Sequence, residues 1–192
     1  MKYINFIIAS LFLASIAQAQ SFGLNLEQFK SSFNAQAKAE SNYPNMAATI
    51  IELKELKKNI YSAKINDGPF KQMVKKWKEM DLANGNFQLK DRLSITTDSS
   101  GKIAKVQAYS DRADMNLFHF LGTFSNIIRT FNKDMTDAQV QSAIKEVGLM
   151  KGNTDPTIGK SLETFTKGAA ITCLSQPSNV TTEVSCAFTP CY

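Results

Sequence analysis

The sequence predicts an α+β domain in which a curved antiparallel sheet carries helices on one face. Helical patterns with capping signatures begin near Asn25 and Thr136, and each is followed by segments that alternate between apolar and polar residues, as hairpin strands do. A long apolar helical pattern at 114–131 lies between the two. The chain has 192 residues and a globular composition, with room for one ordinary domain.

The first helix is predicted to begin after Asn25. Asn25 is a favourable N-cap, and Gln28 completes a capping box with it. Leu24 and Phe29 are spaced for a hydrophobic staple across the same start. The apolar side chains that follow fall on one stripe: Leu26, Phe29, Phe33 and Ala37.

The same signature returns at Thr136. Thr136 is the predicted N-cap and Gln139 its capping-box partner, while Met135 and Val140 are spaced as a staple. Val140, Ile144 and Val147 share one face of this helix. Gly148 is a natural end for it, because glycine readily takes the left-handed conformation that closes many helices.

A hairpin is predicted in each half of the chain. In the first half, apolar residues alternate up to a turn at 98–101, and the segment 103–108 is predicted to be the second strand of the hairpin. These alternating residues are Phe87, Leu89, Leu93 and Ile95. In the second half, the segments around 171–173 and 180–188 alternate on either side of a turn at 175–179.

The second hairpin carries the cysteines. An odd count of three permits one intramolecular disulfide and leaves one thiol. The alternation places Cys173 opposite Cys186 and Ile171 opposite Phe188, so Cys173–Cys186 is the preferred disulfide. A Cys186–Cys191 bridge is the alternative. In the preferred pairing, Cys191 is a free thiol or bridges to another chain.

Residues 45–80 are predicted to be an insertion in the first helix–hairpin unit. The segment 50–65 fits a helix or a strand, and Glu52 and Glu55 would share a face in the helical case. The segment 69–80 favours a helix with Pro69 in its first turn. Its apolar residues share a face: Phe70, Met73, Val74, Trp77 and Met80. Its lysines form a basic stripe: Lys71, Lys75 and Lys78, with Lys76 alongside.

Residues 20–192 are predicted to form a single α+β domain. The repeated order of helix and hairpin divides it into halves at 20–131 and 132–192, as a duplicated unit would. Similar helix starts also arise by coincidence, because capping boxes are common. Both interpretations stay open at this point.

The first nineteen residues have the features of a secretory signal peptide. Lys2 gives a positive start, residues 4–16 are apolar, and Ala17-Gln18-Ala19 is an A-x-A cleavage site before Gln20. The apolar run is too short to span a bilayer, which disfavours an uncleaved anchor. We therefore expect a periplasmic protein, or alternatively a secreted one, with no transmembrane segment in the mature chain. Its cysteines suit such an oxidising compartment.

Three segments carry a resemblance to known proteins. They read LEQFKSSFN, SITTDSSGKIAKVQAY and TDAQVQSAIKEVGL. In these patterns the chain resembles small exported bacterial proteins of unknown function that have a TBP-like, helix-grip α+β architecture. The resemblance implies a curved antiparallel sheet carrying helices, and it implies no catalytic residues.

Residue types that build catalytic and metal sites are sparse. With one histidine and three cysteines, no metal site and no cofactor are predicted. His119 is the one candidate general base near neutral pH, and a carboxylate such as Asp114 could pair with it. Its place between Phe118 and Phe120 favours a structural histidine, and no nucleophile motif accompanies it. The chain is therefore not expected to be an enzyme.

These observations favour a non-enzymatic periplasmic binding protein that acts through protein–protein contact. It would be an immunity or inhibitor protein, or an accessory factor of an envelope or secretion machine. Residues 50–108 hold twelve Lys and Arg against seven Asp and Glu, a charge that would steer an acidic envelope or exported partner. The candidate contacts are Lys71, Lys75, Lys76 and Lys78. Nucleic acid is not an expected partner.

Two other interpretations of the same features remain. The thirteen Phe and seven Met could line a pocket for a small apolar or lipid ligand, which would make the protein a carrier, or they could fill an ordinary core. The surplus of lysines could be a solubilising surface, because the mature chain would carry a formal net charge of only +4.

Overall fold

The computed structural model describes residues 20–40, 48–80, 88–112, 114–150, 159–177 and 182–191. The predicted signal peptide at 1–19 and the predicted strand position of Phe87 lie outside these ranges. The described helices are α1 (Leu26–Glu40), α2 (Gly68–Glu79), α3 (Asp114–Phe131) and α4 (Asp137–Glu146). The described strands are β1 (Ile50–Lys57), β2 (Ile60–Ile65), β3 (Arg92–Thr97), β4 (Ile103–Asp111), β5 (Ser161–Thr166), β6 (Ala169–Pro177) and β7 (Thr182–Pro190).

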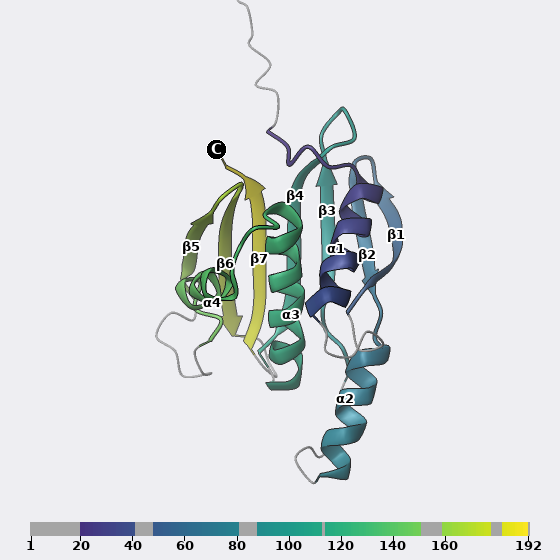
Figure 1. Ribbon diagram of the computed structural model, residues 1–192, viewed down its shortest axis with the longest axis vertical. Coiled ribbons are helices and arrows are strands. Elements are labelled where there is room, and N and C mark those ends of the chain that lie inside the picture. The colour runs from purple at the N-terminus through teal and green to yellow at the C-terminus, as the bar shows by residue number, and fades with distance from the viewer. Residues whose placement is uncertain are drawn as a thin grey trace, which may run out of the picture.

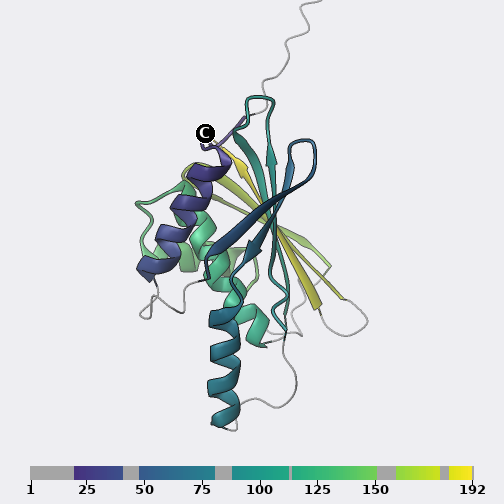
Figure 2. The same ribbon diagram turned by 90° about the vertical axis from the view of Figure 1, so that its right-hand side faces the viewer.

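The strands form one antiparallel sheet in the order β1-β2-β3-β4-β7-β6-β5. Neighbours in sequence lie side by side within each half, and β4 pairs with β7 where the halves meet (Figure 1). Helices α1, α3 and α4 lie on one face of the curved sheet (Figure 2). The predicted α+β class is confirmed. A duplication stays a prediction, because the first half supplies four strands and the second three.

Helix α1 begins as the sequence predicts. The Gln28 amide N–H donates to Asn25 Oδ1, and the Asn25 N–H donates to Gln28 Oε1, each at 2.9 Å. Phe29 and Phe33 of this helix are fully buried, and burying each ring stabilises the fold by about 1.5–3 kcal/mol. The Asn34 side chain binds both the N–H and the C=O of Ile50, so α1 holds the first residue of the edge strand β1.

Helix α4 also has the predicted capping box. Thr136 accepts from the Gln139 amide N–H, and the Gln139 side chain accepts from the Thr136 amide N–H. Gly148 follows the helix with a φ of 74°, the left-handed conformation that ends it. Val140 and Ile144 are buried, which confirms the predicted inner face.

The ambiguous segment 50–65 is a β-hairpin. β1 pairs with β2 across a tight turn in which Asn59 has a φ of 62°, a conformation that asparagine tolerates better than most residues. Glu52 lies opposite Lys64 and Glu55 opposite Tyr61, with one irregularity in the register at each end of β1. The shared carboxylate face that a helix would have given does not form.

Helix α2 has the predicted start, with Pro69 in its first turn, but its packing weakens along the helix, where Met73 and Trp77 are only partly buried. Phe70 and Val74 are buried in a small cluster beside the main core. The rest of the helix projects beyond the end of the sheet (Figures 1 and 2). Met80, predicted on the buried face, is therefore 48% exposed, since no part of the sheet reaches it.

Helix α3 lies across the middle of the sheet and fills the core. Phe120 and Phe124 are fully buried, and the Phe124 ring lies 5.1 Å from that of Phe188 on β7. This helix is the longest of those described, yet none of them is both long and apolar enough to cross a membrane.

A buried arginine ties the end of β4 to the second half. Arg112 is 1% exposed. Its Nη1 donates to Ser175 Oγ on β6, and its Nη2 donates to the carbonyl of Gly148 after α4, both at 3.1 Å. Bonds of this kind keep a buried guanidinium from being a large cost to folding.

The disulfide joins the neighbouring strands β6 and β7 on the side that faces the helices. Cys173 on β6 lies opposite Cys186 on β7, and Ile171 opposite Phe188, which confirms the predicted register. The two cysteines are bonded, and both are buried. Cys191 is a free thiol whose Sγ donates to the Thr166 carbonyl.

We expect the double variant C173A/C186A to lose about 2–4 kcal/mol of unfolding free energy. The crosslink spans 13 residues and restricts the unfolded chain. Denaturant unfolding, followed by circular dichroism, measures the loss. The variant Cys191→Ser is the control and should match the wild type; an equal loss in both would contradict the assignment.

Candidate binding surface at the root of helix α2

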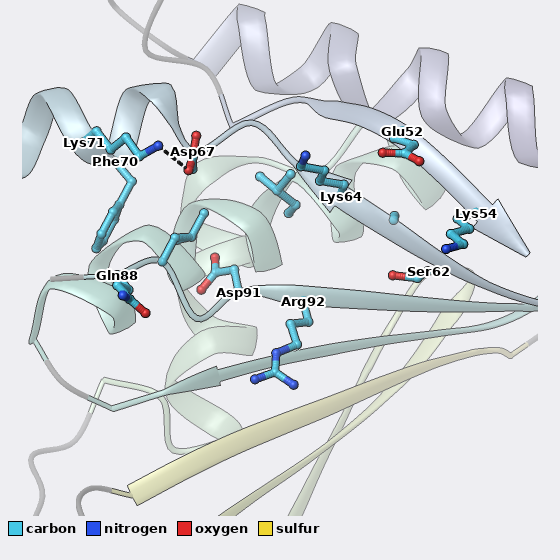
Figure 3. A pocket seen from close by; sticks show the side chains of 13 residues that line it. Glu52, Lys54, Ser62, Lys64, Asp67, Phe70, Lys71, Gln88, Asp91 and Arg92 are labelled. Carbon is cyan, nitrogen blue, oxygen red and sulfur yellow. Dashed lines mark ion pairs between the residues drawn. The ribbon is translucent and has the colours of Figure 1, made fainter. Parts of the chain in front are cut away.

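A hollow of about 700 Å³ lies where β1 and β2, the root of α2 and the start of β3 meet (Figure 3). Phe70 and Leu89 are among its apolar residues, and charged side chains from the strands, from the start of α2 and from the chain before β3 line much of the rest. The hollow exists because α2 leaves the sheet here: Asp67 is the N-cap of the helix, and Phe70 anchors the first turn in the small cluster.

A second hollow of about 890 Å³ lies on the uncovered face of the sheet. Tyr109 and Gln107 of β4 and Ser94 of β3 are among the residues that line it. Ser62 and Arg92 line both hollows, so the two adjoin. Together they form a trough from the root of α2 across the middle of the sheet, and we call this the trough below.

The first hollow combines four cationic side chains with three acidic ones. They are Lys54, Lys64, Lys71 and Arg92, against Glu52, Asp67 and Asp91. Asp67 pairs with Lys71, Asp91 accepts hydrogen bonds from interior side chains, and Glu52 lies opposite Lys64 in the register of β1 with β2. Lys54 and Arg92 form no ion pair with any described residue, so their positive charges are available to a ligand.

Asp67 is held by its neighbour on the next helical turn. Lys71 Nζ lies 2.7 Å from Asp67 Oδ2, and this hydrogen bond is the main reason that the pKa of Asp67 is lowered. Both side chains are more than half exposed, so the pair adds little to stability. It fixes the rim of the hollow more than it stabilises the fold.

Asp91 reaches from the hollow into the interior, where three side chains bind it. Ser110 Oγ donates to Oδ1 at 2.6 Å, Thr123 Oγ1 donates to Oδ2 at 3.0 Å, and His119 Nδ1 lies 2.7 Å from Oδ2. The Asp91 side chain is 1% exposed. A carboxylate with three donors can remain buried at small cost.

The hydrogen bonds of this cluster fit a structural role rather than that of a catalytic serine and histidine. A nucleophilic serine would bind the imidazole, but Ser110 binds the carboxylate instead. His119 Nε2 is buried without a partner among the described residues, and the Phe70 ring lies edge-on to the imidazole at 5.8 Å. Among the described side chains, the carboxylate beside His119 is Asp91, because the chain before β3 lies against α3. The suggested partner Asp114 has a side chain that lies outside the described part of the structure.

The predicted lysines lie along α2, beginning at the trough. Lys71 lines the first hollow, while Lys75 pairs with Glu79 at 3.9 Å one turn further on. Lys76 and Lys78 are exposed on the projecting part of the helix. The stripe is therefore continuous with the hollow at Lys71.

Sequence reasoning missed Lys54, Arg92 and Asp91. Lys54 belonged to a segment whose secondary structure was ambiguous, and Arg92 joins it only through the pairing of β2 with β3. The sequence did carry a signal for Arg92. Arg92 and Ser94 alternate with the apolar Leu93, so they lie on the face of the strand away from the core. In the described part of the chain, no three metal-binding side chains come together.

The chain matches no protein-family model, no curated protein and no solved structure with which it was compared. The TBP-like resemblance accordingly stays a prediction.

Replacing Asp91 should destabilise the protein far more than replacing Asp67. We expect Asp91→Ala to lower the unfolding free energy by about 3 kcal/mol or more, because three buried donors lose their acceptor. Asp67→Ala, at an exposed pair, should cost within about 1 kcal/mol. Denaturant unfolding compares them.

If Asp91→Ala does not fold, Asp91→Asn keeps the shape and should show a smaller loss in the same direction. Equal stability of the Asp91 and Asp67 variants would contradict a structural role for the cluster.

Proposed function

We propose that this chain is a non-enzymatic binding protein of the periplasm that acts through protein–protein contact. The trough and the lysines of α2 form its contact surface. The observation that carries the proposal is that the two are joined: Lys71 belongs both to the first hollow and to the helical stripe. The partner is an acidic envelope or exported protein.

The charges of the trough support an acidic partner. Lys54 and Arg92 stand on neighbouring parts of the sheet without ion pairs among the described residues, and Lys76 and Lys78 extend the positive surface along the helix. Exposed cations placed in this way raise the rate at which an acidic partner associates more than they raise affinity. Hydrogen-bonding groups from Ser94, Gln107 and Tyr109 continue the surface over the sheet.

The shape of α2 supports a protein partner. A projecting helix beside a hollowed sheet can be enclosed by a partner of matching shape. An immunity or inhibitor protein would use it to cap a toxin or hydrolase, and an accessory factor would use it to dock on an envelope or secretion machine. The proposal covers both.

The interior gives less support to the alternative of a carrier for an apolar or lipid ligand. Five of the phenylalanines pack fully buried between sheet and helices: Phe29, Phe33, Phe120, Phe124 and Phe188. They fill the space in which such a ligand would have to lie. The two adjoining hollows open on the surface and are lined by charged and polar groups as well as apolar ones.

Reversing the charges of α2 tests the proposal. We expect K75E/K76E/K78E to lose the partner that the tagged wild type retains in affinity purification from crosslinked cell envelopes, read out by mass spectrometry. With that partner purified, the association rate at low salt should fall about tenfold or more, because steering is lost. Arg92→Glu should act in the same direction.

The matched control is K38E/K133E/K145E. It makes the same change in net charge at exposed positions on α1, at the α3–α4 connection and on α4, away from the trough. It should bind like the wild type. Equal association by the α2 variant and the wild type would overturn the proposed surface, and equal losses in both variants would show that net charge alone matters.

A further inference from the structure

The strand β5 is one edge of the sheet and has no partner on its outer side among the described residues. Every second residue of such an edge directs its backbone N–H and C=O outward, where a further strand can bind them. Phe165 lies on this edge and is 66% exposed, a large apolar side chain for a strand edge. The edge is therefore open to pairing.

The opposite edge has the features that prevent pairing. β1 carries alternating charges, reads IIELKELK, and has two irregularities in its register with β2. Charged side chains and bulges are common protections of edge strands. β5 pairs with β6 in a regular register without such irregularities. The two edges differ, and only β5 offers a regular strand to a partner.

The sequence of this edge is complementary to itself. The strand ends Glu163-Thr164-Phe165-Thr166, and Lys167 follows as the first residue of the turn to β6. In an antiparallel pair centred on Phe165, Phe165 of one copy lies opposite Phe165 of the other, and Glu163 lies opposite Lys167. Thr164 then lies opposite Thr166. Aromatic, opposite-charge and Thr–Thr pairs are all favourable across strands.

The faces of the strand agree with this register. Thr164 is buried and its hydroxyl donates to Glu146 of α4, so it lies on the helix side. Glu163 and Phe165 consequently lie on the uncovered face. Lys167 directly follows the strand, as the first residue of the turn to β6. A two-fold axis through Phe165 keeps the helices of both copies on the same side of the joined sheet.

We propose that two copies of this chain associate through β5, paired antiparallel about Phe165 to form one continuous sheet. A contact in which the same segment meets itself is the isologous kind that closes a two-fold dimer. On the helix side, a hollow of about 460 Å³ between α4 and β5 leaves room beside the new pair. No residue of β5 lines either hollow of the trough, and this contact does not depend on the proposed function.

Charge reversal at two positions tests the register. The molar mass of the full chain is measured by light scattering after size-exclusion chromatography over a series of concentrations. The wild type should reach twice the monomer mass. Glu163→Lys and Lys167→Glu should each remain at the monomer mass, because each places like charges opposite one another.

Mixing the two single variants gives a sharper test. An equimolar mixture of the two single variants should return to twice the monomer mass, since every cross-strand pair between positions 163 and 167 again joins opposite charges. The double variant E163K/K167E should also dimerise, because it exchanges both partners.

Two controls separate this contact from others. Glu183→Lys changes an exposed glutamate on the same face but in the middle of the sheet, and it should dimerise like the wild type. Cys191→Ser should also dimerise, because the contact is not a disulfide. A monomeric wild type at all concentrations, dimers that tolerate both single reversals, or a loss of the dimer in Cys191→Ser would each overturn the proposal.

Discussion

The pairing of β4 with β7 is the constraint on which the rest of the structure depends. It joins two runs of strands that are far apart in sequence into one sheet, with Val106 opposite Phe188 and Ala108 opposite Cys186. These pairs place the apolar side chains of both halves under α3, where Phe124 meets Phe188. The buried Arg112 spans the same junction, because it joins the end of β4 to β6, and the disulfide holds β6 to β7 within the second half.

One consequence of this junction is that the two faces of the sheet differ. The halves place α1, α3 and α4 on a common face, and these helices bury the Phe-rich core. The other face keeps polar and charged side chains and is hollowed across its middle. α2 cannot join the layer of helices, since it leaves the sheet at its end. It stays a projection whose lysines extend the charged surface.

The Asp91 cluster links this surface to the core. The same carboxylate lines the first hollow and binds donors from β4 and α3 in the interior. Phe70, at the root of α2, packs on the imidazole that Asp91 holds. The position of α2, and with it the trough, therefore depends on buried hydrogen bonds as well as on apolar packing.

The sequence by itself determined the local elements. These are the capping boxes at Asn25 and Thr136, the helix at 114–131, the end of α4 at Gly148 and the register of Cys173 with Cys186. These depend on residues close in sequence, whose period and hydrogen bonds are readable from the chain. Only the tertiary structure decided that 50–65 is a hairpin, that Asp91 binds His119, and that Lys54 and Arg92 join Lys71. The hairpin at 50–65 is itself local, but the pairing of β2 with β3 fixes it in the sheet. The other two rest on contacts between segments distant in sequence, which the order of strands in the sheet brings together.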